Sequence, residues 1–166
     1  MRRFKRATRL EKIEEKDPAW KDWKRNQVTS LVERLAAEAR ALRPAIQVST
    51  TGLMPYSRAN LEAYQDWRTW LDRGLVDFVT LMCYSKDTPG FKKYVLEAKN
   101  KVGDMKRVNI AVGAYELLND PKTFGQEFEF CEASGARACV VLHYGNLLQN
   151  TALADPLTEA HSFDKQ

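Results

Sequence analysis

The sequence of 166 residues has no long apolar run and no short motif of the common catalytic classes. No stretch approaches the roughly 18 consecutive apolar residues of a membrane-spanning helix, so no membrane partner is expected. The basic start MRRFKRATRL is not followed by an apolar core, so it is not a secretory signal peptide. No glycine-rich phosphate loop, GxSxG elbow or HExxH motif is present, which leaves kinase, serine-hydrolase and zinc-protease functions without support.

Cysteine and histidine are also scarce. The cysteines are Cys83, Cys131 and Cys139, and the histidines are His143 and His161. The cysteine count is odd and no CxxC spacing exists, so neither a disulfide framework nor a zinc site is expected. Two of the three cysteines lie in apolar segments, where cysteine acts as a small hydrophobic residue. We therefore expect no metal and no cofactor.

The net charge of +4 is concentrated at the start of the chain. Residues 1–16 contain seven basic and three acidic side chains, so the remaining residues are neutral overall. A nucleic-acid site would have to use this arm alone, and a charge run of this kind is more often the solvated face of a helix. We expect residues 1–16 to be a basic lead-in that does not bind nucleic acid.

The rest of the chain is organised around residues 65–85, QDWRTWLDRGLVDFVTLMCYS. Trp67 and Trp70 recur at helical spacing, and Gly74 follows where a helix end favours a positive φ. Residues 76–83 are almost wholly apolar, which predicts a strand covered on both faces, as in a parallel sheet flanked by helices. The polar segment YSKD that follows would lie at the carboxyl end of this strand, where ligands bind in α/β proteins.

The same alternation of helix and strand recurs along the chain. Helices are predicted for residues 18–42, 60–73, 91–102 and 121–134, and strands for residues 46–51, 76–83, 108–114 and 137–143. Residues 52–57 are predicted to form a loop, 88–90 a turn, and 149–166 a tail with a short helix near 156–161. Right-handed crossovers between four such strands predict an α/β fold with a parallel sheet. The sheet is either complete in itself or the second half of a (β/α)8 barrel.

Four segments, in this order, resemble the carboxyl half of the family 10 glycoside-hydrolase-like barrels of bacteria. They are DPAWKDWKRNQVTSLVERLAAEARALRP, QDWRTWLDRGLVDFVTLMCYS, VNIAVGAYELL and GARACVVLHYGNL, and the resemblance covers roughly residues 13–148. The resemblance implies that residues 17–148 form the second half of a TIM barrel, with strands six, seven and eight ending in LMCY, GAYE and LHY. Such relatives are often exported and act on cell-wall or extracellular polysaccharide. Their main catalytic acid ends the fourth strand, so this chain would be a fragment lacking it.

Acidic and aromatic residues at the predicted strand ends are the candidates for a sugar site. Hydrolysis of a glycosidic bond needs two carboxyl groups, about 5–5.5 Å apart for retention and about 6.5–9.5 Å apart for inversion. Only Asp87 and Glu116 lie at strand ends, and they are the candidate catalytic residues. The candidate substrate-binding residues are Tyr84, Tyr115, His143 and Tyr144.

Each candidate also has a structural interpretation. Asp87 precedes Thr-Pro-Gly, which is typical of a turn, and Glu116 is typical of a surface loop. The tyrosines could equally close the core, and a lone histidine is typically held by structural hydrogen bonds. His143 and Asn146 stand where relatives carry a hydroxyl-bearing and an acidic residue, so this strand end departs from the family pattern.

Two classes of function follow from these observations. The first is a glycoside-hydrolase-like protein that acts on O-glycosidic bonds of a poly- or oligosaccharide. The alternative is a non-catalytic α/β module that binds a ligand or a protein. Exposed sheet edges would favour self-association in either case. The sequence leaves the localisation of the protein open.

Overall fold

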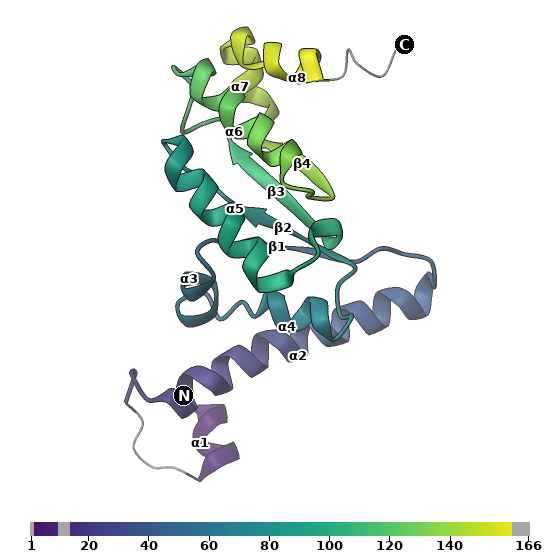
Figure 1. The fold of residues 1–166 in the computed structure, drawn as a ribbon. Coiled ribbons are helices and arrows are strands. Elements are labelled where there is room, and N and C mark those ends of the chain that lie inside the picture. Colours follow the sequence, from purple (N-terminus) through teal and green to yellow (C-terminus); the bar gives the residue numbers. More distant parts are fainter. Residues whose placement is uncertain (1, 10–13, 161–166) are drawn as a thin grey trace.

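The computed structural model describes residues 2–9 and 14–160 and shows a four-stranded parallel sheet with helices between the strands (Figure 1). The strands, in chain order and in sheet order, are β1 (Ser49–Leu53), β2 (Phe78–Met82), β3 (Val108–Gly113) and β4 (Ala138–Leu142). The helices are α1 (Arg2–Thr8), α2 (Pro18–Leu42), α3 (Tyr56–Leu61), α4 (Trp67–Asp72), α5 (Thr88–Val102), η1 (Met105–Arg107), α6 (Pro121–Ala133), α7 (Tyr144–Gln149), η2 (Thr151–Leu153) and α8 (Asp155–Ala160). The predicted parallel α/β fold is confirmed, and it corresponds to part of a TIM barrel.

The strand pairings repeat at a constant spacing along the chain. The first partners in the three registers are Ser49 with Phe78, Val79 with Val108, and Asn109 with Ala138, which are 29 residues apart in each case. Each repeat therefore holds one strand and one helical segment that crosses back to the next strand. Right-handed crossovers of this kind place successive helices on the same face of the sheet.

Helices α4, α5 and α6 lie on one face of the sheet (Figure 1). Side chains alternate between the two faces of a strand, and on β2 the alternation is visible in the burial. Val79 and Leu81 face the helices and have no exposed surface, whereas Phe78 and Met82 face the other way and are only half-buried. The expectation that residues 76–83 are covered on both faces is wrong, because only one face meets described helices.

Aspartate caps fix the start of the three longest helices, α2, α5 and α6. Asp17 accepts a hydrogen bond from the Ala19 amide at 2.8 Å, and Asp120 accepts one from the Thr123 amide at 3.0 Å. Asp87 caps α5 in the same way, so the predicted turn at residues 88–90 is the first turn of that helix. A side-chain oxygen at this position satisfies an amide that has no partner within the helix.

Helix α2 occupies the predicted residues but buries less than its apolar pattern implies. Val28 and Val32 pack against the core, where Trp70 Nε1 of α4 donates to the Thr29 hydroxyl at 2.9 Å. Leu31 and Leu35, on the neighbouring stripe of the helix, are 55% and 58% exposed. The periodicity is sufficient to predict the helix, but these two leucines have no described neighbour that buries them.

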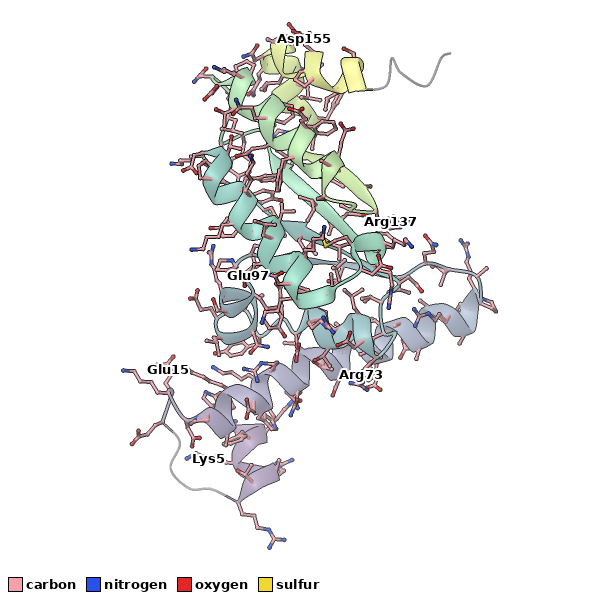
Figure 2. All side chains as sticks on the ribbon, viewed as in Figure 1. Lys5, Glu15, Arg73, Glu97, Arg137 and Asp155 are labelled. Carbon is pink, nitrogen blue, oxygen red and sulfur yellow. A yellow bond between two sulfur atoms is a disulfide. The ribbon has the colours of Figure 1, made fainter. Side chains whose placement is uncertain are left out.

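Ion pairs add to the contact between α2 and the first repeat. Arg73, which follows α4 and is labelled in Figure 2, donates to Glu33 of α2 at 2.8 Å. Arg40 of α2 donates to Asp77 at 3.1 Å, and the same carboxylate accepts from the Val48 amide at 2.6 Å. These contacts join α2 to the amino ends of β1 and β2.

Two boundaries differ from prediction around β1. The strand covers Ser49–Leu53 rather than residues 46–51, so the predicted loop at 52–57 begins inside the strand. The predicted helix at 60–73 is two short helices, α3 and α4, separated at Tyr64, whose φ is 56°. Asp66 then restarts the helix by accepting from the Thr69 amide at 3.2 Å. Gly74 ends it with φ at 65°, as its position predicted.

The expectation that cysteines form no disulfide is wrong. Cys131 on α6 and Cys139 on β4 are bonded, with their Cα atoms 6.1 Å apart. Cys131 lies on the buried face of α6, and the chain reverses after this helix to enter β4, so two residues eight positions apart meet in space. Cys83 remains a buried free thiol.

β4 was predicted to be a buried strand, yet both of its end residues are exposed because it lies at the edge of the sheet.

Both ends of the described chain pack against the rest. Phe4 of α1 is buried against both Trp20 and Trp23 of α2, with ring centroids 5.1 and 5.6 Å apart. Part of the predicted basic lead-in, residues 1 and 10–13, lies outside the described residues. Leu153 in the predicted tail is fully buried, and α8 matches the short helix predicted near 156–161, of which residue 161 is not described.

Of the helices in the described part of the chain, none has the length and apolarity needed to span a membrane.

Candidate functional site at the carboxyl ends of the strands

Because all four strands are parallel, their carboxyl ends meet at one edge of the sheet. In α/β folds this edge is where ligands bind. The segments that leave β2, β3 and β4 there carry the sequence-predicted candidates Tyr84, Asp87, Tyr115, Glu116, His143 and Tyr144.

Tyr84 and Tyr115 form an aromatic pair at this edge. Their ring centroids are 5.4 Å apart and their planes meet at 79°, an edge-to-face contact. Gly113 makes room for the pair, because a Cβ atom at this position would lie 3.1 Å from Cδ1 of Tyr84. Tyr84 is half-buried and Tyr115 is 42% exposed. One ring thus supports another that faces solvent.

Both phenols of this pair hold their protons more tightly than free tyrosine. Burial raises the pKa of Tyr84, with smaller contributions from Tyr115 and Cys83. Burial also raises the pKa of Tyr115, followed by the charge of the adjacent Glu116 carboxylate. The two hydroxyl groups are therefore hydrogen-bond donors at neutral pH.

Glu116 lies in the turn that follows β3. Its amide donates to the Gly113 carbonyl at 3.0 Å, and the next residue, Leu117, is buried. The Glu116 side chain is 27% exposed, and its Oε2 lies 3.8 Å from Nζ of the exposed Lys86. An ion pair with one solvated partner contributes little stability. The turn, rather than the ion pair, holds this carboxylate beside the tyrosine pair.

Asp87 has a structural task in the fold. Its Oδ1 accepts from the Gly90 amide at 2.7 Å, which caps α5. Its own amide donates to the Ser85 hydroxyl at 3.3 Å. One carboxylate oxygen is thereby occupied by the helix start, although the side chain is exposed.

His143 and Asn146 together start α7. His143 Nδ1 accepts from the Gly145 amide at 3.1 Å, while the His143 amide donates to Oδ1 of Asn146 at 3.0 Å. The peptide between Leu142 and His143 is cis. Tyr144 is 70% exposed and makes no aromatic pair among the described residues. The structure therefore groups Tyr84, Tyr115 and Glu116, and gives His143 a capping role.

A buried carboxyl group that the sequence prediction missed lies on α6. Glu127 has no exposed surface, and neither of its oxygens has a hydrogen-bond partner in the described part of the chain. Burial, followed by the charge of Asp87, raises the pKa of Glu127 to about 8. The sequence does carry a signal for this buried carboxyl group. Glu127 lies three residues after Phe124 and four residues before Cys131, so helical spacing puts it on the apolar face of α6.

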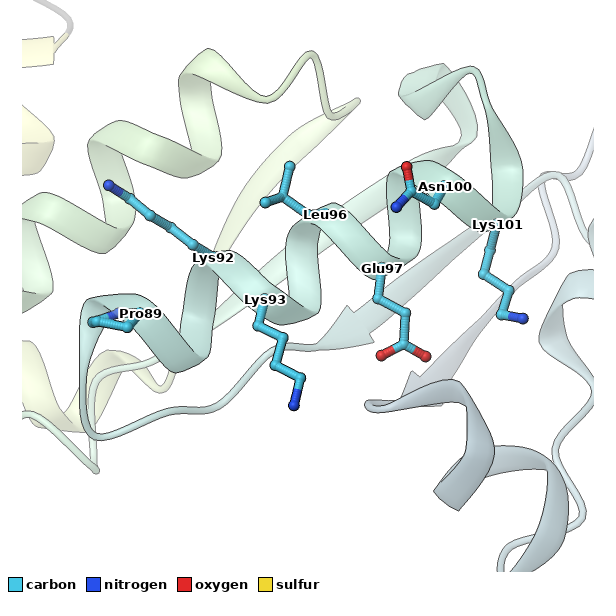
Figure 3. Close-up of a pocket in the computed structure, with 7 residues that line it drawn as sticks. All are labelled: Pro89, Lys92, Lys93, Leu96, Glu97, Asn100 and Lys101. Carbon is cyan, nitrogen blue, oxygen red and sulfur yellow. The ribbon is translucent and has the colours of Figure 1, made fainter.

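A hollow of about 720 Å³ lies elsewhere, on the surface of α5 (Figure 3). Its lining residues are Pro89, Lys92, Lys93, Leu96, Glu97, Asn100 and Lys101. All belong to one helix, so the hollow is an open groove along a helix rather than an enclosed site. It contains none of the strand-end residues, and we therefore place the candidate site at the strand ends. No cluster of three metal-ligating side chains occurs within the described residues.

Comparison with known families gave a match. Residues 2–122 match the model of a family described as glycosyl hydrolase-like 10. The matched segment begins before the predicted span of 13–148 and ends within α6, so it contains Tyr84, Tyr115 and Glu116 but not β4. No curated protein sequence matches the chain.

Proposed function

This chain belongs to the glycosyl hydrolase-like 10 family, and we propose that it contributes the strand-end sugar site of a glycoside-hydrolase-like protein acting on a poly- or oligosaccharide. The observation that carries the proposal is the group formed by Tyr84, Tyr115 and Glu116 at the carboxyl ends of β2 and β3. The family match supports the proposed chemical class, and the geometry of these three residues supports the proposed location of the site.

The chemistry of this group suits a sugar ring. The apolar C–H faces of a pyranose pack on aromatic rings, and Tyr115 offers a ring that is partly exposed and braced by Tyr84. Protonated phenols donate to sugar oxygens, while the carboxylate of Glu116 accepts from sugar hydroxyl groups. The site thus combines a stacking surface with donors and an acceptor around it.

Hydrolysis requires a second carboxyl group, and the described part of the chain places none that is free at this site. Asp87 is committed to capping α5 through one of its oxygens, and Glu127 is buried within the helix layer. We propose that Glu116 is one acid of the reaction and that the main acid comes from a polypeptide segment outside the described residues. The chain is then the carboxyl half of a barrel, which binds sugar by itself and hydrolyses it only when completed.

The alternative is a non-catalytic binding module. It is favoured by the structural roles of Asp87 and His143, which leave Glu116 as the only candidate carboxylate beside the tyrosine pair within residues 2–9 and 14–160. The two functions share the sugar-binding surface and differ in whether a completed site cleaves a glycosidic bond.

Titration calorimetry against a panel of soluble α- and β-linked oligosaccharides tests the proposal. Tyr115→Ala should weaken the binding of a recognised sugar about fivefold, the loss expected for one aromatic contact of about 1 kcal/mol. Lys93→Ala, on the outer face of α5, is the matched control and should bind like the unchanged protein. Failure of the unchanged protein to bind any of the panel, or equal loss in both variants, would contradict the proposed site.

A further inference from the structure

Glu127 lies on the buried face of α6, which packs against α5 and the sheet. It has no exposed surface, and its two carboxyl oxygens have no hydrogen-bond partner among the described residues. Phe124 and Phe128 of the same helix belong to the hydrophobic core, so the surroundings of this group are apolar. A carboxyl group in such a position is tolerated when it is protonated and is costly when it is charged.

The start of α5 lies against α6 next to this group. The Thr88 hydroxyl, in the first turn of α5, donates to Oε1 of Gln126, the residue before Glu127, at 3.1 Å. Asp87 precedes this turn and caps α5 by accepting from the Gly90 amide. The charge of Asp87 also acts on Glu127. The buried carboxyl group and the cap of α5 are therefore neighbours.

The segment that leads from β2 into α5 is tightly folded. The Ser85 hydroxyl donates to the Asp87 carbonyl at 2.9 Å and accepts from the Asp87 amide at 3.3 Å. A Cβ atom at Gly90 would lie 2.5 Å from Oγ of Ser85, so the turn has no room to adjust there. Tyr84 begins this segment and carries the ring that supports Tyr115. A movement of the start of α5 is therefore passed on to the tyrosine pair.

The groups around Glu127 include no cation that balances its charge within the described residues. Cys83, beyond the end of β2, is a buried thiol whose pKa is raised by burial, followed by the charges of Glu127 and Glu97, so it stays neutral. The lysines of α5 are exposed, and Lys92 places its Nζ over the Phe130 ring, 5.0 Å from the centroid. β3, β4 and η2 contain no charged side chain, and those of α8 are acidic.

Loss of the Glu127 proton to solvent changes what this part of the core requires. Burial, followed by the charge of Asp87, raises the pKa of Glu127 to about 8, so the proton is lost in mildly alkaline solution. The charged form needs water around it. A hollow of about 420 Å³ lies between α5 and α6, with Thr88, Gln126 and Phe130 in its lining. Water that enters from this hollow separates the two helices where Thr88 meets Gln126.

We propose that Glu127 is a positioning residue, whose protonated form keeps the start of α5 against α6 and thereby holds Tyr84 against Tyr115 in the strand-end site. The charged form draws water between the helices and lets the segment that carries Tyr84 move. The affinity for sugar is then highest while the proton is bound, and it falls as the pH rises. This inference deepens the proposed function and rests on it for the role of the tyrosine pair as a sugar surface.

The first test needs no ligand. Protein with isotope-labelled tyrosine rings is titrated by NMR from about pH 6 to about pH 9, and spectra of Tyr84→Phe and Tyr115→Phe assign the two ring signals. Both phenols keep their protons over this range because their pKa values are raised. Their signals should shift with a midpoint at about pH 8, the pKa of Glu127. Glu127→Gln should abolish the shift, while Glu129→Gln, an exposed change on the same helix, should leave it.

The second test measures sugar affinity by calorimetry at the two ends of this pH range. About one tenth of the molecules keep the Glu127 proton one pH unit above its pKa, so the affinity of the unchanged protein should fall about tenfold. Glu127→Gln should bind equally well at both ends, and Glu129→Gln should follow the unchanged protein. Circular dichroism shows whether each protein is folded at both pH values. If Glu127→Gln does not fold, Glu127→Met takes its place as an uncharged side chain of similar length.

Three results would overturn the inference. They are tyrosine ring signals that do not titrate, a titration that persists when Glu127 is replaced, and a sugar affinity that stays constant while the ring signals titrate. The proposed function fails separately. If the ring signals titrate as expected but no oligosaccharide binds at either pH, Glu127 positions the tyrosine pair and the sugar-site assignment is wrong.

Discussion

Replacing the buried Glu127 with glutamine should make the protein more stable, and the gain should grow with pH. The pKa of this group is about 8 in the folded protein and 4.5 in an ordinary environment. A raised pKa means that the folded state binds the Glu127 proton more tightly than the unfolded state does. The resulting contribution to the free energy of unfolding is complete below pH 4.5 and is lost as the pH rises to about 8. Each pH unit in this window costs about 1.4 kcal/mol, which amounts to a loss on the order of 4 kcal/mol by the alkaline end.

Glu127→Gln keeps the shape of the side chain and removes its titration, so the slope between these pH values should disappear. Urea unfolding followed by tryptophan fluorescence, repeated from about pH 5 to about pH 9, measures the free energy of unfolding across the window. Glu129→Gln, an exposed change on the same helix, is the control and should keep the slope of the unchanged protein. Parallel pH profiles for the Glu127 variant and the unchanged protein would refute the assignment of a buried, unpartnered carboxyl group.

Three further predictions concern other parts of the molecule. Gly113→Ala places a Cβ atom 3.1 Å from the ring of Tyr84, so it should weaken sugar binding in calorimetry and cost about 1–3 kcal/mol of stability; an unchanged affinity would show that the ring position does not matter. Reducing the Cys131–Cys139 disulfide opens a short loop and should lower the free energy of unfolding by about 2.5 kcal/mol in the chain-entropy description, measured by urea unfolding with and without reductant; identical curves would contradict this. A backbone amide, followed by an arginine, lowers the pKa of Asp77, so its stabilisation is present above pH 3.8 and is lost as the pH falls through the lower folded value. Asp77→Asn should therefore reduce the stability at neutral pH and flatten the acid limb of the pH profile, and an unchanged acid limb would show that this carboxylate is not stabilised by folding.

The features that could be predicted from the sequence are those with local causes. Asp17 followed by proline marks the start of α2, and Gly74 ends α4 with the positive φ that its position implies. The apolar runs that became β2 and β3 indicated buried strands because each is flanked by helical periodicity. These signals depend on residues within a few positions of one another, so they are readable without the fold.

The features that could not be predicted depend on what lies across space. The disulfide forms because α6 turns back onto β4, and cysteine spacing alone carries no sign of that reversal. The periodicity of α2 shows apolar stripes but not which stripe has a neighbour, so the exposure of Leu31 was not foreseen. At the site, strand ends located Tyr84 and Tyr115, yet their edge-to-face contact depends on Gly113 in an adjacent strand.

The constant spacing of 29 residues between strand partners has a consequence for how the chain acquires its structure. Every strand pairs with the next strand in the sequence, so the entropic cost of closing each connecting loop is the same. We expect each strand to find its partner as soon as one further repeat has left the ribosome, because no pairing waits for a distant part of the chain. Synthesis from the amino terminus would then assemble the sheet one strand at a time, from β1 toward β4.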